Sequence, residues 1–385
     1  MIILSIETSC DETAVAIVEA TGVFPNAKYR VLGNGLLSQI DIHREFGGVF
    51  PAVAKREHAK ALVPMLAKAL REAGMLHEVP TTLANDTEAE LVTLLEREPT
   101  LAELLIEFFK HHDYPAIDAI AVTNGPGLAP ALWVGVNFAR ALSRNWNIPV
   151  IPVNHMEGHI LSSVFEGDHL GTLNFPALAL LISGGHTEFV FMHDFKTYEK
   201  IGSTRDDAVG EAFDKVARML GLPYPGGPEI SRLATQARAE NLPTLLPPLP
   251  RPMIHTPDFD FSFSGLKTAV RTRVLDKEIS DSERVIIARD FEDATTEVLI
   301  KKTSNALKQT NAQTLILGGG VTANTTIRDA FQNLVAKEFP DVTLHLPDPT
   351  LSTDNAIMIA LSGHARVNQA SINTETLTAN GNLSL

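Results

Sequence analysis

The sequence predicts an α/β protein with mixed sheets, organised as two lobes. Strand-like apolar segments alternate along the chain with segments of helical periodicity, which is typical of this class. The chain has 385 residues, more than a single hydrophobic core usually supports. A pattern of strand, polar turn and strand in residues 2–18 recurs in residues 177–192, as a duplicated domain would produce.

The elements of the first half follow from apolar patterns and from glycine or proline at their ends. The first hairpin has expected strands at Ile2–Ile6 and Ala14–Val18, on either side of a polar turn. The remaining elements are a helix at Lys55–Ala73, a buried strand at Ala119–Val122 that ends in Asn124-Gly125-Pro126-Gly127, and a helix at Asn137–Asn145.

The second half begins with the second hairpin, whose expected strands are Ala177–Ile182 and Phe189–Met192. The loop Pro243–Pro252 contains five prolines and is too apolar for a flexible linker, so we expect packed irregular structure there. The other expected elements are helices at Gly210–Leu220, Glu283–Gln309, Thr325–Ala336 and Ala356–Leu361, a short helix after Ser262-Phe263-Ser264-Gly265, and a strand at Thr314–Leu317.

Residues 76–115 differ from the rest of the chain because they are acidic and lack strand patterns. Capping boxes at Thr87 with Glu90 and at Thr100 with Glu103 predict two short amphipathic helices. Two interpretations stay open: a helical hairpin packed against its own lobe, or a surface that contacts or replaces part of a partner subunit.

Composition and charge limit the classes of protein that fit. Hydrophobic residues make up 44% and charged residues 20%, which is ordinary for a globular protein. The single cysteine, Cys10, excludes an intramolecular disulfide and fits a reducing cytoplasm. We expect a cytoplasmic protein that neither spans a membrane nor is exported, because no long apolar run or leader pattern occurs. The net charge of −14 opposes non-specific nucleic-acid binding, so a nucleic-acid substrate must meet a local basic patch or be presented by a partner.

Two histidines, His155 and His159, give the first chemical signal. Four residues apart at the start of an expected helix, they project from one face and suit a divalent metal, although such a pair can also arise by accident. A zinc protease fits badly, because Met156 stands where a zincin needs glutamate and Gly158 where the inverted motif needs it. Glu157 lies about 100° further round the helix and cannot replace that base.

Other polar positions have both a structural and a functional interpretation. Asp354 could cap the helix at Ala356–Leu361 or complete a His, His, Asp ligand set. Asp11 and Glu12, in the first hairpin turn, are solvated residues or acid/base groups. Lys267 and Arg271, with Arg273 nearby, form a basic cluster that contacts phosphate or is merely solvated.

Glycine-rich turns at Ser183-Gly184-Gly185 and Gly318-Gly319-Gly320 would let backbone amides approach an anion. Neither has the Walker A or dinucleotide spacing, and each alone is more simply a structural turn. Their recurrence in a duplicated frame favours a nucleotide between two lobes.

Taken together, the motifs resemble one family: TsaD, the tRNA adenosine threonylcarbamoyltransferases, once described as O-sialoglycoprotein endopeptidases. The motifs span the chain in order except for about residues 76–115. They are Ile6-Glu7-Thr8-Ser9-Cys10-Asp11-Glu12-Thr13, Asn124-Gly125-Pro126-Gly127-Leu128, Asn154-His155-Met156-Glu157-Gly158-His159, Ser183-Gly184-Gly185-His186-Thr187, residues 206–215, Tyr224-Pro225-Gly226-Gly227-Pro228, residues 263–268, Gly318-Gly319-Gly320-Val321 with Asn324, and Thr353-Asp354-Asn355-Ala356.

The resemblance implies a duplicated actin-like, sugar kinase and Hsp70-type fold (the ASKHA, RNase H-like class) with an interlobe cleft. It implies first and second lobes at residues 1–152 and 153–385, and the C-terminal helix could return to the first lobe. It implies a metal, iron in preference to zinc, held by His155, His159 and Asp354. The threonylcarbamoyl adenylate would be held by Leu181, Ile182, Ser183, Gly184, Gly185, Asp214, Gly227 and Asn324.

The implied activity is transfer of threonylcarbamoyl from threonylcarbamoyl-AMP to N6 of adenosine 37, in tRNAs that read codons beginning with A. Asp11 or Glu12 would handle the proton, and the expected partners are tRNA, ATP and TsaB-type and TsaE-type proteins. This sequence departs from the family pattern at Ala52, Ser231 and Ala129-Pro130-Ala131. In the family, these positions belong to the ribose contacts and to the first wall of the cleft.

Two alternative functions share this fold class: a small-molecule kinase, and an ATP-responsive binding module that acts only as a scaffold. The histidine pair has no evident task in a kinase. Retention of all three implied metal ligands argues against a scaffold.

Overall fold

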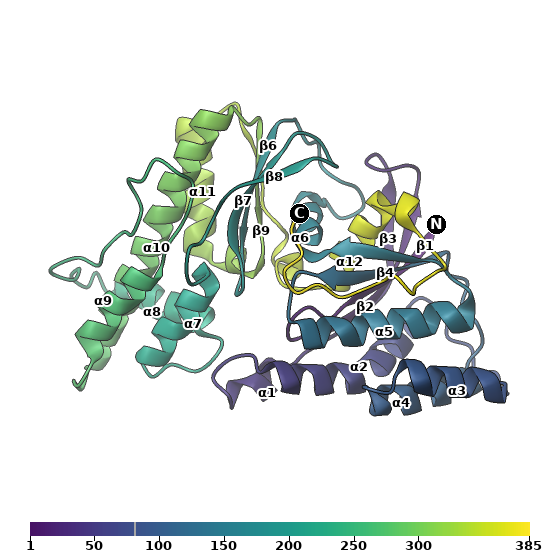
Figure 1. The fold of residues 1–385 in the computed structure, drawn as a ribbon. Coiled ribbons are helices and arrows are strands. Elements are labelled where there is room, and N and C mark those ends of the chain that lie inside the picture. Colours follow the sequence, from purple (N-terminus) through teal and green to yellow (C-terminus); the bar gives the residue numbers. More distant parts are fainter. Residues whose placement is uncertain (81) are drawn as a thin grey trace. The chain divides into compact units, whose positions relative to one another are not determined.

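The computed structural model describes residues 1–80 and 82–385, and the chain divides into two compact units (Figure 1). Unit 1 comprises Met1–Ile42, Val49–Gly171 and Asp354–Leu385, and unit 2 comprises His43–Gly48 and Thr172–Thr353. Each unit contains one five-stranded mixed sheet.

The sheet of unit 1 has the strand order β3-β2-β1-β4-β5. Its strands are β1 (Ile2–Glu7), β2 (Glu12–Thr21), β3 (Lys28–Ser38), β4 (Ala119–Gly125) and β5 (Val150–Asn154). The first three strands are antiparallel neighbours, whereas β1, β4 and β5 run parallel to one another.

The sheet of unit 2 repeats this topology. Its strands are β6 (Ala177–Ile182), β7 (Thr187–Met192), β8 (Tyr198–Ser203), β9 (Thr314–Gly318) and β10 (Thr343–His345). The order is β8-β7-β6-β9-β10, again with an antiparallel half and a parallel half. The matching order and pairing confirm the predicted duplicated α/β fold.

Helices of unit 1 cover both faces of its sheet (Figure 1). They are α2 (Pro51–Glu72), α3 (Asn85–Leu94), α4 (Pro99–His111), α5 (Ala129–Trp146), α6 (His155–Val164) and α12 (Ala356–Ala365), and the short α1 (Ile40–Arg44) spans the division between the units. Leu4 and Ile6 of β1 face α2 and α5, while the alternate residue Ser5 donates to the Ala356 carbonyl of α12 at 2.6 Å. A strand covered on both faces needs the nearly continuous apolar sequence that β1 has.

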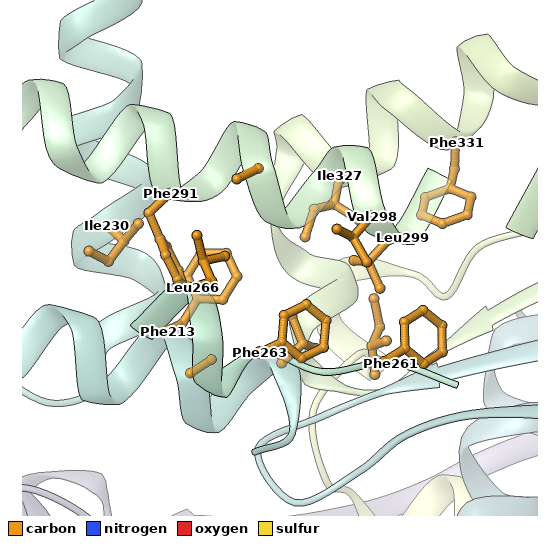
Figure 2. Packing of buried hydrophobic residues seen from close by; sticks show 14 of the residues in the cluster. Phe213, Ile230, Phe261, Phe263, Leu266, Phe291, Val298, Leu299, Ile327 and Phe331 are labelled. Carbon is orange, nitrogen blue, oxygen red and sulfur yellow. The ribbon is translucent and has the colours of Figure 1, made fainter. Parts of the chain in front are cut away.

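Unit 2 has a core built mainly by the long helix α10 (Asp281–Thr310), which presents Phe291, Val298 and Leu299 to its neighbours (Figure 2). Its other helices are α7 (Val209–Met219), α8 (Gly226–Ala239), α9 (Ser264–Val274) and α11 (Thr325–Glu338). Short 3-10 helices lie at Gly320–Ala323, Pro349–Leu351 and, in unit 1, Val367–Gln369. A capping box of Ser280 and Glu283 begins α10. The proline-rich loop is irregular, as predicted, but mostly not packed: Leu249 is buried and Arg289 donates to the Pro243 carbonyl at 2.7 Å, whereas Leu246 is 85% exposed.

The unit boundary lies at Gly171, later than the expected lobe boundary at residue 152. Residues 153–171 stay with unit 1 because α6 packs against α12, which also lies on β1, β2 and β4. No helix in residues 1–80 or 82–385 combines the length and apolarity that crossing a membrane requires.

The acidic segment forms two helices, as predicted, but the capping boxes are wrong. The N-caps of α3 and α4 are Ala84 and Glu98, so Thr87 and Thr100 lie inside the helices. Pro99 is at the first helical position of α4, where its missing N–H costs no hydrogen bond.

The buried face of this hairpin belongs to the core of unit 1. Its buried apolar residues are Leu91, Leu95, Leu101, Leu105, Ile106, Phe108 and Phe109. Glu98 is also buried, where it pairs with Lys55 of α2 at 2.9 Å and accepts from Asn137 of α5 at 3.2 Å. The segment therefore packs against its own lobe, and removing residues 76–115 would uncover core residues of α2 and α5.

Truncation of the buried face of α4 should destabilise unit 1 selectively. Leu105 is 0% exposed and its neighbour Leu104 is 36% exposed. We expect Leu105→Ala to lower the free energy of unfolding by about 2–5 kcal/mol, and the matched Leu104→Ala by about 1 kcal/mol or less. Both tryptophans, Trp133 and Trp146, lie on α5 of unit 1, so fluorescence-detected urea unfolding follows this unit. Equal effects of the two variants would contradict the packing described for α4.

Candidate metal centre and substrate site

Three side chains from distant parts of the chain converge in unit 1. His155 and His159 lie on α6, whose N-cap Asn154 accepts from the Met156 amide. Asp354 lies just before α12. One potential ligand atom of each of the three residues lies within 4.8 Å of the others, so the group could hold a metal ion.

Asp354 does not cap α12. The N-cap is Asn355, whose side chain accepts from the Met358 amide at 2.9 Å. The Asp354 carboxylate is instead directed to the histidines: its Oδ1 lies 3.4 Å from His155 Nε2 and 3.2 Å from His159 Nε2. The capping interpretation of Asp354 is therefore wrong.

The chemistry of these side chains fits a divalent cation. Both ring nitrogens of His159 are buried: in the described part of the chain Nδ1 has no hydrogen-bond partner, and Nε2 has only the poorly aligned Asp354 carboxylate, 3.2 Å away. Leaving a buried polar atom unsatisfied is costly, and a metal ion beside Nε2 would remove part of that cost. Two imidazoles and one carboxylate also form a ligand set that zinc and iron accept.

Electrostatics keeps the carboxylate ionised. Burial raises the pKa of Asp354, but His155 and His159 outweigh burial and hold that pKa well below its usual range. Burial lowers the pKa of His155, whereas the charges of Asp354 and Glu7 raise it well above its ordinary value. In the absence of a metal, a proton on His155 therefore fills the role of the cation, and a bound metal must displace it.

The predicted acid/base residues lie in the same unit: Asp11 is in the turn between β1 and β2, and Glu12 is the first residue of β2. Burial raises the pKa of the Glu12 carboxyl well above its ordinary value, and the charges of Asp11 and Asp354 raise it further. The Asp11 carbonyl accepts from the Gln39 amide at 3.0 Å, which ties the turn to the end of β3. A carboxyl with a raised pKa keeps its proton to higher pH than an exposed glutamate does, which suits an acid/base group.

In unit 2, the two glycine-rich turns lie side by side. They follow β6 and β9, which are parallel neighbours with Leu181 paired to Gly318. Gly319 has φ 92°, and a Cβ there would lie 2.5 Å from the Ile182 carbonyl oxygen, so only glycine allows this approach. The Gly210 amide at the start of α7 donates to the Ser183 carbonyl at 3.2 Å.

The remaining predicted substrate residues sit at helix ends near these turns. Asp214 of α7 accepts from the Gly226 amide at 2.7 Å, which holds the N-terminus of α8 and its Gly227 close to α7. Asn324 is the N-cap of α11 and donates to Glu292 at 2.6 Å. Gly-rich turns and helix N-termini suit a phosphate-containing ligand.

Not every predicted substrate residue can contact a ligand through its side chain. Leu181 and Ile182 are completely buried in β6, so they could contribute only backbone groups. By contrast, an added Cβ at Gly184, Gly185 or Gly227 meets no atom within 4 Å. Space for a ligand therefore exists beside these glycines.

Sequence reasoning missed the polar groups that support both sites. Glu7 and Ser9 contact His155, Thr123 donates to Glu7, and Glu292 accepts from Asn324. The only available signal was a charged residue at the end of an otherwise apolar strand, as with Glu7.

The duplicated sheets define a two-unit protein of the actin-like class, and the His, His, Asp group marks it as one that could bind a metal. A family model described as TsaD, tRNA N6-adenosine threonylcarbamoyltransferase, matches residues 30–82 and 98–361. The chain belongs to this family. The model leaves out residues 83–97, a shorter gap than the predicted 76–115.

Relatives of known function agree over nearly the whole chain. The tRNA N6-adenosine threonylcarbamoyltransferase of Burkholderia ambifaria (strain ATCC BAA-244 / DSM 16087 / CCUG 44356 / LMG 19182 / AMMD) is 41% identical over 374 residues, covering 95% of this chain and 92% of that protein. The enzyme of the same name from Nitrosomonas europaea (strain ATCC 19718 / CIP 103999 / KCTC 2705 / NBRC 14298) is 39% identical over 385 residues, covering 100% and 97%. The chain is thus an enzyme that forms threonylcarbamoyladenosine in tRNA, which decides against the kinase and scaffold alternatives.

Among solved structures, full-length HypF in its phosphate- and nucleotide-bound form matches 71% of this chain and 42% of its own, with a TM-score of 0.45 and 13% identity. Similarity at this level supports no further conclusion.

A buried ion pair links α6 to the end of α12, beside the three candidate metal ligands. Arg366, after α12, donates through Nε to both carboxylate oxygens of Glu157 on α6, at 3.1 and 3.0 Å. The Glu157 side chain is 2% exposed and that of Arg366 is 26% exposed.

Arg366→Met should destabilise unit 1, because it removes the cation that faces a buried carboxylate. We expect the free energy of unfolding to fall by about 2–4 kcal/mol. This is at or below the usual range for breaking a buried ion pair, because Arg366 is partly exposed. The control is Arg30→Met, which breaks the exposed pair of Arg30, 70% exposed, with Glu19 and should cost about 0–1 kcal/mol. Unfolding followed by tryptophan fluorescence measures both, and similar losses would show that the buried pair has no special role.

Proposed function

We propose that His155, His159 and Asp354 hold one divalent metal, iron in preference to zinc, and that this centre serves the transfer reaction. The observation that carries the proposal is the convergence of the His155 and His159 rings on an ionised Asp354, whose Oδ1 lies 3.4 and 3.2 Å from their Nε2 atoms. When bound, the metal would act as a Lewis acid towards the acyl group.

The proposed reaction is transfer of threonylcarbamoyl from threonylcarbamoyl-AMP to N6 of adenosine 37, in tRNAs that read codons beginning with A. An exocyclic adenine amine is a weak nucleophile and loses a proton when it is acylated, so a base must lie near it. We assign this task to Asp11 or Glu12. Glu12 is the stronger candidate, because a carboxyl whose pKa is raised is a better base once ionised.

In unit 2, we propose that the two glycine-rich turns and the N-termini of α8 and α11 bind the adenylate. Backbone amides in Ser183-Gly184-Gly185 and at Gly227 would face the phosphate, while Asp214 and Asn324 hold those helix ends in place. Leu181 and Ile182 would contribute through backbone groups alone.

We further propose that TsaB-type and TsaE-type partner proteins assist the enzyme and that it works in the cytoplasm. The net charge of −14 supports a need for partners, because long-range repulsion opposes the approach of tRNA. The single cysteine fits a reducing compartment.

Incubation of the protein with unmodified tRNA, threonine, bicarbonate, ATP and the partner proteins of the same organism tests the proposed reaction. Mass spectrometry of the digested tRNA should then detect threonylcarbamoyladenosine at position 37. Product at another adenosine, or product formed equally well without this chain, would contradict the proposed reaction.

Loss of either histidine should abolish metal binding while the fold persists. We expect His155→Ala and His159→Ala to lack the stoichiometric metal of the parent protein and to lose transfer activity, since two ligands cannot replace three. Elemental analysis measures occupancy, with His169→Ala as the control, because His169 is about half exposed and lies outside the group. Full occupancy in the double variant would end the metal proposal.

A bulky side chain at Gly185 should exclude the adenylate without disturbing the fold. An added Cβ at Gly185 meets no atom within 4 Å, so Gly185→Leu projects into the space assigned to the ligand. We expect at least about tenfold weaker binding of a non-hydrolysable adenylate analogue, a loss of roughly 1.4 kcal/mol. The control, Gly265→Leu, places the same side chain on exposed α9. Unchanged affinity in Gly185→Leu by calorimetry would contradict the proposed adenylate site.

A further inference from the structure

We propose that Glu7 is a positioning residue that orients His155 and fixes the tautomer in which its Nε2 can bind a metal. The inference rests on the metal site proposed above and adds a function for a buried carboxylate outside the three ligands. Glu7 is the last residue of β1, and its side chain is fully buried.

The hydrogen bonds around Glu7 assign it the role of acceptor. The Ser9 amide donates to Oε1 at 2.5 Å, and the Thr123 hydroxyl donates to Oε2 at 2.5 Å. A backbone N–H can only donate, so Oε1 must accept. The carboxylate is thus held in one orientation by the turn after β1 and by the adjacent strand β4.

Without a metal both nitrogens of His155 face a carboxylate, but when a metal replaces the proton on Nε2, this held carboxylate keeps the remaining proton on Nδ1. Glu7 Oε2 lies 3.1 Å from His155 Nδ1, and an ionised carboxylate can only accept. His155 therefore donates from Nδ1, which leaves Nε2 directed at Asp354 Oδ1, 3.4 Å away. Nε2 is the nitrogen that the metal requires to be unprotonated.

Ser9 also contacts His155 but cannot set the tautomer. Its hydroxyl lies 3.2 Å from His155 Nδ1 and 3.5 Å from Asp354 Oδ2. A hydroxyl donates or accepts equally well, whereas the carboxylate allows one direction only. The charge-assisted bond to Glu7 is also the stronger of the two.

Carboxylates that accept from metal-bound histidines typically contribute 10–100-fold to metal affinity, by orienting the ring and raising its basicity. Glu7 has the geometry of such a group before any metal binds. Its buried negative charge, one imidazole ring away from the ligand position, also attracts a cation.

The decisive variant is Glu7→Gln, which keeps the size of the side chain and reverses one hydrogen bond. The glutamine oxygen must stay with the Ser9 amide, so its NH2 group faces His155 Nδ1 and donates to it. His155 must then carry its proton on Nε2. We expect about 10–100-fold weaker Zn²⁺ binding to the metal-free full-length protein, measured by competition calorimetry with a chelator.

A second readout separates positioning from general destabilisation. In ¹⁵N-histidine-labelled, Zn²⁺-loaded protein, long-range ¹H–¹⁵N spectra should show a protonated Nδ1 on the metal-bound His155 of the parent, and this Nδ1–H signal should be lost in Glu7→Gln. Glu19→Gln, on the exposed part of β2, is the control and should leave both the tautomer and the affinity unchanged.

Two further variants keep the test informative if Glu7→Gln folds poorly. Ser9→Ala removes the hydroxyl contact and retains the carboxylate, so Zn²⁺ affinity should change by less than about threefold. Thr123→Val removes one donor that holds Glu7 and should weaken Zn²⁺ binding by about 3–10-fold, less than Glu7→Gln does. Parental affinity and tautomer in Glu7→Gln would overturn this inference, and so would parental affinity in Thr123→Val. Parental affinity in His155→Ala would instead overturn the metal site itself.

Discussion

The packing of α12 against the central strand of unit 1 is the constraint on which the site depends. Every residue from Ala356 to His364 is buried, so the helix is apolar on all sides, as a core helix must be. Ser5 of β1 holds its first carbonyl, and a Cβ at Gly363 would lie 2.5 Å from the Ala121 side chain. Because both ends are fixed, the chain just before α12 must place Asp354 beside the histidines of α6.

The duplication explains how one topology serves two kinds of chemistry. In unit 1, Asp11 lies in the turn after the first strand and Glu12 begins β2, and in unit 2 the equivalent turn is Ser183-Gly184-Gly185. Carboxyl groups at the first turn suit proton transfer, while bare backbone amides at the second suit an anion. The two units share one strand order and differ in the side chains at the ends of their strands.

Sequence patterns predicted the central strands, the long helices and the three proposed ligands, because these depend on local spacing. They missed the edge strands β3, β5, β8 and β10 and the helix α8; in β3, Gly33 and Gly35 interrupt the pattern so that α2 can approach. The role of Glu7 could not be predicted, since it depends on contacts with Thr123 and His155, far away in sequence. Capping boxes failed at α3 and α4 because Thr-x-x-Glu also occurs inside helices.

X-ray absorption of the full-length protein loaded with one equivalent of Zn²⁺ tests the central claim most directly, namely that His155, His159 and Asp354 share one cation. We expect two imidazole ligands, detected through the scattering of their outer ring atoms, with oxygen completing the coordination shell at about 2.0–2.2 Å. We expect no sulfur shell at about 2.3 Å. A spectrum with fewer than two imidazoles, or with sulfur from Cys10, would show that His155, His159 and Asp354 do not share one cation.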